Sequence, residues 1–358
     1  PQLNNKTPLE TAKKPSLNRI ADTGICGIMD PIAPGVPPGS DTATLALLGY
    51  DPIKVYSGRG ALEALGSGVD VLPQDVVFRC NFATVDKNLN VIDRRAGRIE
   101  TSDSSELVEA FKETVFKNHK DVQITFRNTI QHRAILQLRG PKLSRMVSDS
   151  DPQKTGTPIL TVNPRDDTPE AKKTADIANE FTQCSLEILK NHQVNARRIK
   201  EGLPPANAIL CRGAGTLPVV APISLLYGIR GAAVSVMPLI RGVCKVAGLR
   251  LLDVKDATGT YDTDVVAKGK AAVQALKTHD FVFVHVKATD VASHDGKVKQ
   301  KIRMIEKIDG MVGCILEKVS LDETLVAVTA DHTTSLVTRE HEGCLLYTSP
   351  SPRDRQKS

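Results

Sequence analysis

Apolar runs alternate with an amphipathic helix toward the end of the chain, and this alternation restricts the fold more than any other feature. The runs at 232–236, 280–286 and 324–329 each have the length and composition of a buried strand. Buried strands joined by helices predict an α/β fold in which helices cover both faces of a parallel sheet. The helix between the last two runs carries a stripe formed by Val298, Ile302, Ile305, Ile308, Val312 and Ile315.

A central stretch interrupts this pattern. Strand-like segments at 134–138 and 208–211 flank a helix predicted for 169–191, which Thr168 begins and which has Pro169 at its first position. A chain of 358 residues is also longer than one hydrophobic core usually serves. We therefore expect a discontinuous core and an inserted domain, with the core formed by 1–75 and 219–343 and the insertion by 76–218.

Charge and composition narrow the classes of function. The net charge of +6 is spread along the chain, and there is no Trp and only 4% aromatic residues for stacking on bases. This favours a solvated surface with an anionic small-molecule site over nucleic-acid binding. No apolar run reaches membrane-spanning length, so no membrane partner is expected. Seven cysteines without CxxC spacing indicate reduced thiols and a cytoplasmic protein. Because the chain begins at Pro1, an organellar targeting segment ahead of it stays open, as does the oligomeric state.

Two Asp/His pairs follow predicted strands. Asp290 and His294 come after the second run, Asp331 and His332 after the third, and His341 lies nine residues further on. Ligands bind at the carboxyl ends of strands in open α/β sheets, and these oxygen and nitrogen donors suit zinc or manganese. Five donors exceed one tetrahedral site, which favours two metal ions in one crevice. The alternative for any single histidine is an ordinary hydrogen-bonded or surface residue.

Ser40 stands at the predicted start of a helix, after a short helix at 15–22, a strand at 24–29 and a Pro/Gly loop at 30–39. Helix N-termini favour phosphate, and a metal-bound serine can become a nucleophile near neutral pH. Ser40 is therefore a candidate acceptor of a phosphoryl group. The simpler alternative is a plain N-cap.

A set of basic residues completes the candidate site. Arginine forks match phosphate and carboxylate oxygens in a bidentate manner, although any one of them can be a solvated surface charge. The candidate substrate-binding residues are Arg94, Arg95, Arg98, His132, Arg133, Arg212 and Lys287.

Taken in order, ten short motifs resemble those of the archaeal-type, cofactor-independent phosphoglycerate mutases of the alkaline phosphatase superfamily. Several are unmistakable in sequence, such as Pro38-Gly-Ser-Asp-Thr-Ala43, Asp93-Arg-Arg-Ala-Gly-Arg98 and Lys287-Ala-Thr-Asp290. The others lie at 24–31, 48–52, 58–60, 79–86, 212–215, 294–296 and 330–332, so the resemblance covers about Lys6 to His341.

The resemblance implies an α/β, alkaline-phosphatase-like core with an inserted α/β cap that acts as a lid. It implies interconversion of 2-phosphoglycerate and 3-phosphoglycerate through a phosphoserine, with two divalent ions (Mn, Zn, Mg or Co) and without free 2,3-bisphosphoglycerate. The pattern gives Ser40 as nucleophile. It assigns Ser40, Asp331 and His332 to one metal, and Asp290, His294 and His341 to the other.

The chain departs from the family pattern at both ends. The family's first strand carries an aspartate ligand ahead of the segment that begins at Pro1, and 344–358 resembles translated adapter sequence, a probable non-native tail. We therefore expect a mutase truncated at both ends and not competent as written. Another phosphatase or phosphopentomutase of the superfamily, or a non-catalytic binding protein that kept the fold, are the alternative functions.

Overall fold

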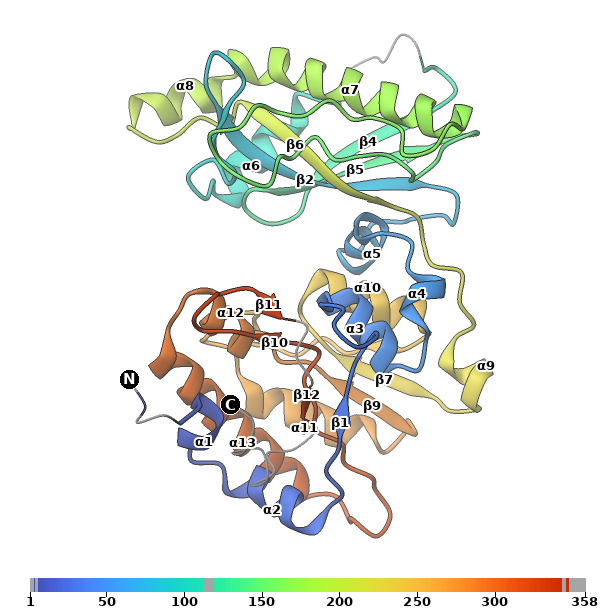
Figure 1. The fold of residues 1–358 in the computed structure, drawn as a ribbon, viewed down its shortest axis with the longest axis vertical. Helices are drawn as coiled ribbons and strands as arrows, with labels where there is room; N and C mark the ends of the chain where they lie inside the picture. Colours follow the sequence, from blue (N-terminus) through green and yellow to red (C-terminus); the bar gives the residue numbers. More distant parts are fainter. Residues whose placement is uncertain (1–2, 4–5, 113–118, 343–345, 348–358) are drawn as a thin grey trace. The chain divides into compact units, whose positions relative to one another are not determined.

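The computed structural model describes residue 3 and residues 6–112, 119–342 and 346–347 (Figure 1). The chain divides into two compact units, one formed by Pro1–Tyr56 and Val220–Ser358 and the other by Ser57–Val219. Both units mix helices and strands. The tail predicted at 344–358 lies outside the described residues, except for Leu346 and Tyr347.

A three-stranded parallel sheet organises the first unit. Its strands are β7 (Gly231–Val234), β8 (Arg250–Leu251) and β9 (Phe281–Val284), in the order β8-β7-β9. Both neighbours of β7 run parallel to it, which confirms the parallel pairing predicted for the runs at 232–236 and 280–286.

Helices pack against this sheet and against each other. Helix α11 (Val265–Ala275) contacts β7 and β9, and the long helix α13 (Val298–Leu316) packs on α11. The predicted stripe of α13 is confirmed, since Ile305 and Val312 are buried. No helix in the described ranges is both long and apolar enough to cross a bilayer. The other helices of this unit are α1 (Pro8–Thr11), α2 (Pro15–Thr23), α3 (Ser40–Leu47), α4 (Pro52–Val55), α9 (Ile223–Tyr227), α10 (Pro238–Val246) and α12 (Ala288–His294).

Of the strands predicted for the first unit, the one at 324–329 is absent and the one at 24–29 is shorter than predicted. Residues 324–330 are irregular and pair with no strand in the described part of the chain, and Leu325 is 97% exposed. The strand predicted at 24–29 shortens to β1 (Ile28–Met29), which pairs antiparallel with β12 (Leu346–Tyr347). A small hairpin follows the irregular segment, formed by β10 (Thr333–Thr334) and β11 (His341–Glu342).

The second unit is an antiparallel sheet with a helical cover. Helix α7 (Pro169–Lys190) begins after Thr168, whose side chain accepts a hydrogen bond from the Ala171 N–H, as predicted. Its Phe181 packs against Phe126 of the sheet, with ring centroids 5.1 Å apart. The strands are β2 (Val76–Val85), β3 (Val91–Asp93), β4 (Gln123–Asn128), β5 (Arg133–Arg139) and β6 (Ala208–Gly215), with helices α5 (Arg59–Gly66), α6 (Thr101–Glu109) and α8 (Gln193–Lys200).

The boundary before the second unit falls at Tyr56, earlier than the residue 75 expected from sequence. Helix α5 is the reason, because it packs directly on the backbone of β2. A Cβ atom on Gly60 would lie 1.9 Å from the Val77 carbonyl oxygen, so only glycine permits this approach. Ala61 and Ala64 of the same helix join Val77 and Ile135 in one buried cluster.

A buried ion pair fixes one end of β5. The side chain of Asp75 is fully buried, and it accepts hydrogen bonds from Arg139 Nη2 at 2.8 Å and Gln137 Nε2 at 2.7 Å. Burial acts to raise the pKa of Asp75, but these donors and the Leu72 N–H outweigh it and leave the pKa lowered. Asp70 pairs with the same arginine at 3.4 Å, but its side chain is 82% exposed.

We expect Asp75→Ala to lower the free energy of unfolding by about 3 kcal/mol, because it removes the buried carboxylate that accepts from Arg139 and Gln137 and leaves the arginine only the exposed Asp70 as an ionic partner. Asp70→Ala is the matched control and should cost less than about 1 kcal/mol. Since the pKa of Asp75 is lowered in the folded state, its contribution is present above the unfolded pKa and is lost as pH falls through the folded pKa. Urea unfolding at neutral and acid pH measures both effects; equal costs for the two variants would contradict the prediction.

Candidate metal centre

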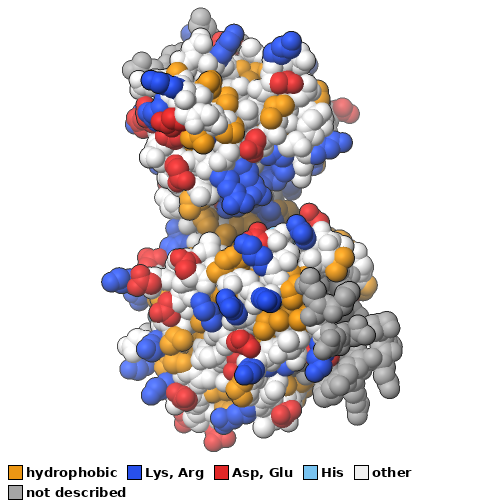
Figure 2. All heavy atoms as spheres, turned by 90° about the vertical axis from the view of Figure 1, so that its left-hand side faces the viewer, with side chains coloured by type: hydrophobic (Ala, Val, Ile, Leu, Met, Phe, Trp, Pro, Cys, Tyr) orange, Lys and Arg blue, Asp and Glu red, His pale blue; other side chains and the backbone are white. Residues whose placement is uncertain are grey.

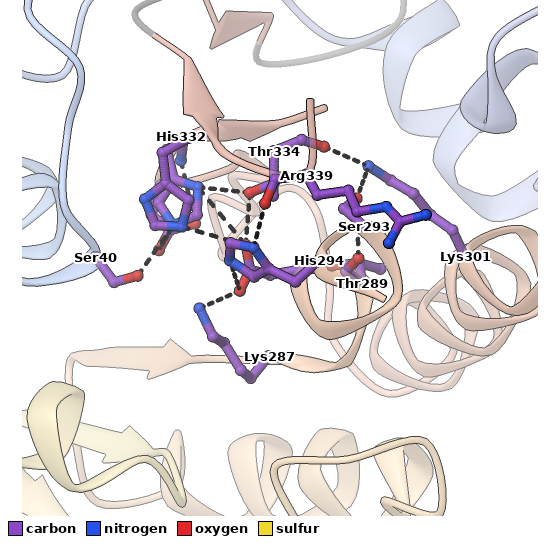
Figure 3. A network of polar contacts seen from close by, with 12 residues as sticks. Ser40, Lys287, Thr289, Ser293, His294, Lys301, His332, Thr334 and Arg339 are labelled. Atoms are coloured by element: carbon purple, nitrogen blue, oxygen red, sulfur yellow. Dashed lines mark hydrogen bonds and ion pairs between the residues drawn. The ribbon is translucent and has the colours of Figure 1, made fainter. Parts of the chain in front are cut away.

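Asp290 contacts several ionisable groups of the first unit, and Figure 3 shows the polar network that includes His294, His332 and Lys287. Asp290 belongs to α12, the short helix that begins shortly after β9. Its Oδ2 lies 3.4 Å from His294 Nε2, one helical turn along, and its Oδ1 lies 3.5 Å from His341 Nε2 on β11. Lys287 pairs with Oδ2 as well. The segment after β9, the helix α12 and the hairpin β10–β11 therefore all contribute side chains that contact the Asp290 carboxylate.

The imidazoles of His294 and His341 face this carboxylate in one defined tautomer. His294 Nδ1 lies 2.6 Å from the Arg339 carbonyl oxygen, and His341 Nδ1 lies 3.3 Å from the Pro38 carbonyl oxygen. A carbonyl oxygen only accepts, so Nδ1 carries the proton in both rings. Nε2 of each ring is then directed inward, toward Asp290, which is the orientation that histidine ligands of metals adopt.

Ser40 and His332 form the other side of the cluster. Ser40 is 7% exposed, and its Oγ lies 2.9 Å from His332 Nε2. Asp331 Oδ2 is 3.3 Å from the same nitrogen. Ser40 is the first residue of α3 and Gly39 holds the N-cap position, so the plain N-cap reading of Ser40 is wrong. No side chain from Gly39 caps the first N–H groups of this helix, which leaves them able to bind an anion.

The donors of this cluster fit a divalent cation. One ligand atom each from Asp290, His332 and His341 lie within 4.8 Å of one another. The Oδ2 atom of Asp331 is buried and accepts no hydrogen bond, although it lies beside His332 Nε2. A buried carboxylate oxygen needs a positive partner, and carboxylate and imidazole donors suit zinc or manganese.

Burial and charge hold these groups in the protonation states that bind metal. Burial acts to raise the pKa of Asp290, but the contact with His341 and the charge of Lys287 outweigh it, and the pKa lies well below its usual range. Burial lowers the pKa of His332 to about 4, and the Asp331 carboxylate opposes this only in part. At neutral pH Asp290 is therefore ionised and His332 is neutral, as metal ligation requires.

Three residues near this centre escaped the sequence analysis. Thr334 is 5% exposed and contacts Asp290 and His332 through its hydroxyl. Lys301 of α13 interrupts the apolar stripe between Val298 and Ile305, a polar residue on a buried face that could have marked it. His285 follows β9 and its buried Nδ1 has no hydrogen-bond partner. A lone histidine in an apolar run was the available signal.

The predicted basic residues, Lys287 apart, belong to the second unit, where Figure 2 shows Lys and Arg side chains gathered in a dense patch. Two of them meet at the fully buried side chain of Asp151. Arg94 donates to both of its carboxylate oxygens, at 3.1 and 2.7 Å, and Arg212 Nε lies 3.7 Å from it. Arg95 and Arg98 are exposed on the turn after β3.

The pKa of His132 reflects the positive charge of the arginines around it. Burial lowers its pKa to about 3, and the charges of Arg133, Arg95, Arg79 and Arg212 act in the same direction. Its Nδ1 is buried without a hydrogen-bond partner. Arg79, which the sequence analysis did not select, pairs with Glu63 at 3.3 Å. The signal was a charged residue inside an otherwise apolar strand. The region carries more buried positive charge than it neutralises, which favours an anionic ligand.

A mixed α/β chain that brings a serine, carboxylates and inward-facing imidazoles together has the donor set of a metal-dependent enzyme. The profile of a family described as 2,3-bisphosphoglycerate-independent phosphoglycerate mutase matches residues 21–195. A protein of that name from Methanopyrus kandleri is 46% identical over 99% of this chain and 85% of its own length. Its counterpart from Ignicoccus hospitalis is 48% identical over 96% of this chain and 83% of its own length.

Solved structures agree. A protein of Pyrococcus horikoshii superimposes with a TM-score of 0.82 at 36% identity, over 97% of this chain and 82% of that chain. The cofactor-independent phosphoglycerate mutase of Thermoplasma acidophilum gives 0.64 at 35% identity, over 97% and 84%. The chain belongs to the 2,3-bisphosphoglycerate-independent phosphoglycerate mutases, a family of isomerases.

Asp290 contacts both His294 and His341. Asp290→Asn should therefore weaken Mn²⁺ binding on the order of a hundredfold, because it removes the negative charge of this carboxylate. Asp295→Asn is the control: this carboxylate lies just beyond α12 but pairs with Tyr261 and Lys297 instead. Titration calorimetry with Mn²⁺ on the chain stripped with a chelator compares the two. Equal affinities for both variants would refute the placement of the metal centre at Asp290.

Proposed function

We propose that this protein interconverts 2-phosphoglycerate and 3-phosphoglycerate by way of a phosphoserine on Ser40. The observation that carries the proposal is the contact of 2.9 Å between Ser40 Oγ and His332 Nε2, at the first residue of α3. A serine so placed has a base or ligand at its hydroxyl and helix N–H groups beside it for the phosphate oxygens.

The cluster offers ligands for two ions, each Mn, Zn, Mg or Co. When bound, such ions lower the pKa of a serine hydroxyl and neutralise phosphate charge. Ser40 then attacks phosphorus while the glycerate's own oxygen leaves, and the second hydroxyl of the retained glycerate later takes the phosphoryl group back. Ser40, Asp331 and His332 would hold one ion, and Asp290, His294 and His341 the other.

The basic residues serve the anionic ends of the substrate. Lys287, beside Asp290, is placed to neutralise phosphate at the metal centre. Arg94, Arg95, Arg98, His132, Arg133 and Arg212 of the second unit would bind carboxylate and phosphate oxygens through bidentate and charged contacts.

The reaction also requires a dry site, because water at the phosphoserine would release inorganic phosphate and turn the mutase into a phosphatase. We assign the first unit as an alkaline-phosphatase-like core and the second as an inserted cap that acts as a lid. The parallel sheet β8-β7-β9, which carries Asp290 beyond its β9 end, supports the first assignment.

In the complete protein supplied with 2-phosphoglycerate and Mn²⁺, we expect mass spectrometry to find one phosphate on the Ser40 peptide. Ser40→Ala should abolish the label and lower turnover on the order of a thousandfold or more, as loss of a nucleophile does. Ser320→Ala, at an exposed serine after α13, is the control and should keep the label. Phosphate on another residue, or full turnover by Ser40→Ala, would overturn the assignment, and steady release of inorganic phosphate would instead indicate a phosphatase.

A further inference from the structure

Thr334 contacts two residues of the metal centre through a single hydroxyl group (Figure 3). Its Oγ1 lies 2.5 Å from Asp290 Oδ1 and 3.0 Å from His332 Nδ1. The side chain is 5% exposed, so no water competes freely for these contacts. The two partners come from different elements, α12 and the segment just before β10.

The number of protons decides the direction of both hydrogen bonds. A threonine hydroxyl has one proton, and an ionised carboxylate only accepts, so the proton of Thr334 is donated to Asp290. The hydroxyl oxygen can then only accept from His332, which requires the imidazole proton on Nδ1. A neutral imidazole has one N–H, so Nε2 is left with its lone pair directed at Ser40 Oγ, 2.9 Å away.

We propose that Thr334 is a positioning residue that fixes the tautomer of His332, and through it the state of the nitrogen that faces Ser40. For His294 and His341 a backbone carbonyl performs this task, and no substitution of a side chain can remove it. His332 alone among these three depends on a side chain. The inference rests on the proposed role of His332 at Ser40, and it adds what controls that role.

Lys301 holds Thr334 in place. Its ammonium group donates to the Thr334 carbonyl oxygen at 3.2 Å and to Ser293 Oγ at 2.5 Å, and Ser293 in turn donates to the Thr289 carbonyl oxygen at 3.4 Å. These contacts tie α13 and α12 to β10 (Figure 3). The position of the hydroxyl relative to Asp290 is thereby fixed from the backbone side.

The same hydroxyl links the two proposed groups of ligands, because Asp290 belongs to one and His332 to the other. Without it, the Nδ1 proton of His332 loses its acceptor. The Asp331 carboxylate, 3.3 Å from Nε2, is then the charged acceptor left to the ring and draws the proton to Nε2. The ring would then present an N–H, instead of a lone pair, to Ser40 and to any metal ion.

Thr334→Val keeps the shape of the side chain and removes the hydroxyl, whereas Thr334→Ser keeps the hydroxyl. Thr333→Val is the matched control, because adjacent residues of a strand point to opposite faces. Each full-length chain is labelled with ¹⁵N-histidine and stripped of metal. Long-range proton–nitrogen correlation spectra at neutral pH, assigned with a His332→Asn chain, report the tautomer; calorimetry with Mn²⁺ then reports affinity.

We expect the Nδ1–H tautomer of His332 in the wild type, Thr334→Ser and Thr333→Val, and the Nε2–H tautomer in Thr334→Val. Mn²⁺ affinity should fall about 10- to 100-fold in Thr334→Val alone, as for other partners of metal-bound histidines. An unchanged tautomer in Thr334→Val, or equal losses in Thr334→Ser and Thr334→Val, would overturn the proposal. If the tautomer switches as expected but Ser40 never carries phosphate, the proposed function fails and the positioning role of Thr334 stands.

Discussion

The rest of the site depends on the contacts that the buried carboxylate of Asp290 makes with its neighbours. A buried carboxylate is costly unless it is paired, and Asp290 draws its partners from α12, from the β10–β11 hairpin and from Lys287. Lys301 adds a second link between these elements through Ser293 and the Thr334 carbonyl oxygen. The hairpin that supplies His341 and Thr334 to this carboxylate follows directly after His332, whose Nε2 contacts Ser40 Oγ.

Hydrogen bonds made by the Nδ1 atoms orient the three imidazoles. Each Nδ1 proton has an acceptor outside the cluster, so each Nε2 is left to face inward, before any ion is bound. Such preorganisation lowers the cost of assembling a metal site, because the ligands need not reorient. The second unit has an excess of positive charge instead. Asp151 neutralises only part of the arginine charge around His132, so this region favours an anionic ligand.

The sequence predicted those parts of the site that local spacing determines. Asp290 and His294 are one helical turn apart, Asp331 and His332 are adjacent, and Ser40 precedes a clear helical pattern. It did not predict Thr334, because a lone hydroxyl carries no spacing signal and its role arises from contacts across the fold, and it passed over Lys301, whose place in the apolar stripe of α13 was the available signal. The strand predicted at 324–329 is absent for a related reason: an apolar run reports a tendency to form a strand, whereas a strand exists only where it pairs with a neighbour, and these residues pair with none in the described chain. The first domain boundary shifted because a glycine contact, Gly60 on Val77, assigned α5 to the second unit.

The central claim is that Ser40, Asp290, Asp331 and the three imidazoles form a centre for two metal ions, and anomalous diffraction tests it most directly. Crystals of the full chain grown with Mn²⁺ should show two anomalous peaks roughly 4 Å apart, as in other two-metal sites. One peak should lie at ligand distance from Ser40 Oγ and His332 Nε2, and the other from Asp290 and His341 Nε2. A single peak, or peaks bound to other residues while this cluster remains as an ion-free hydrogen-bonded network, would contradict the account.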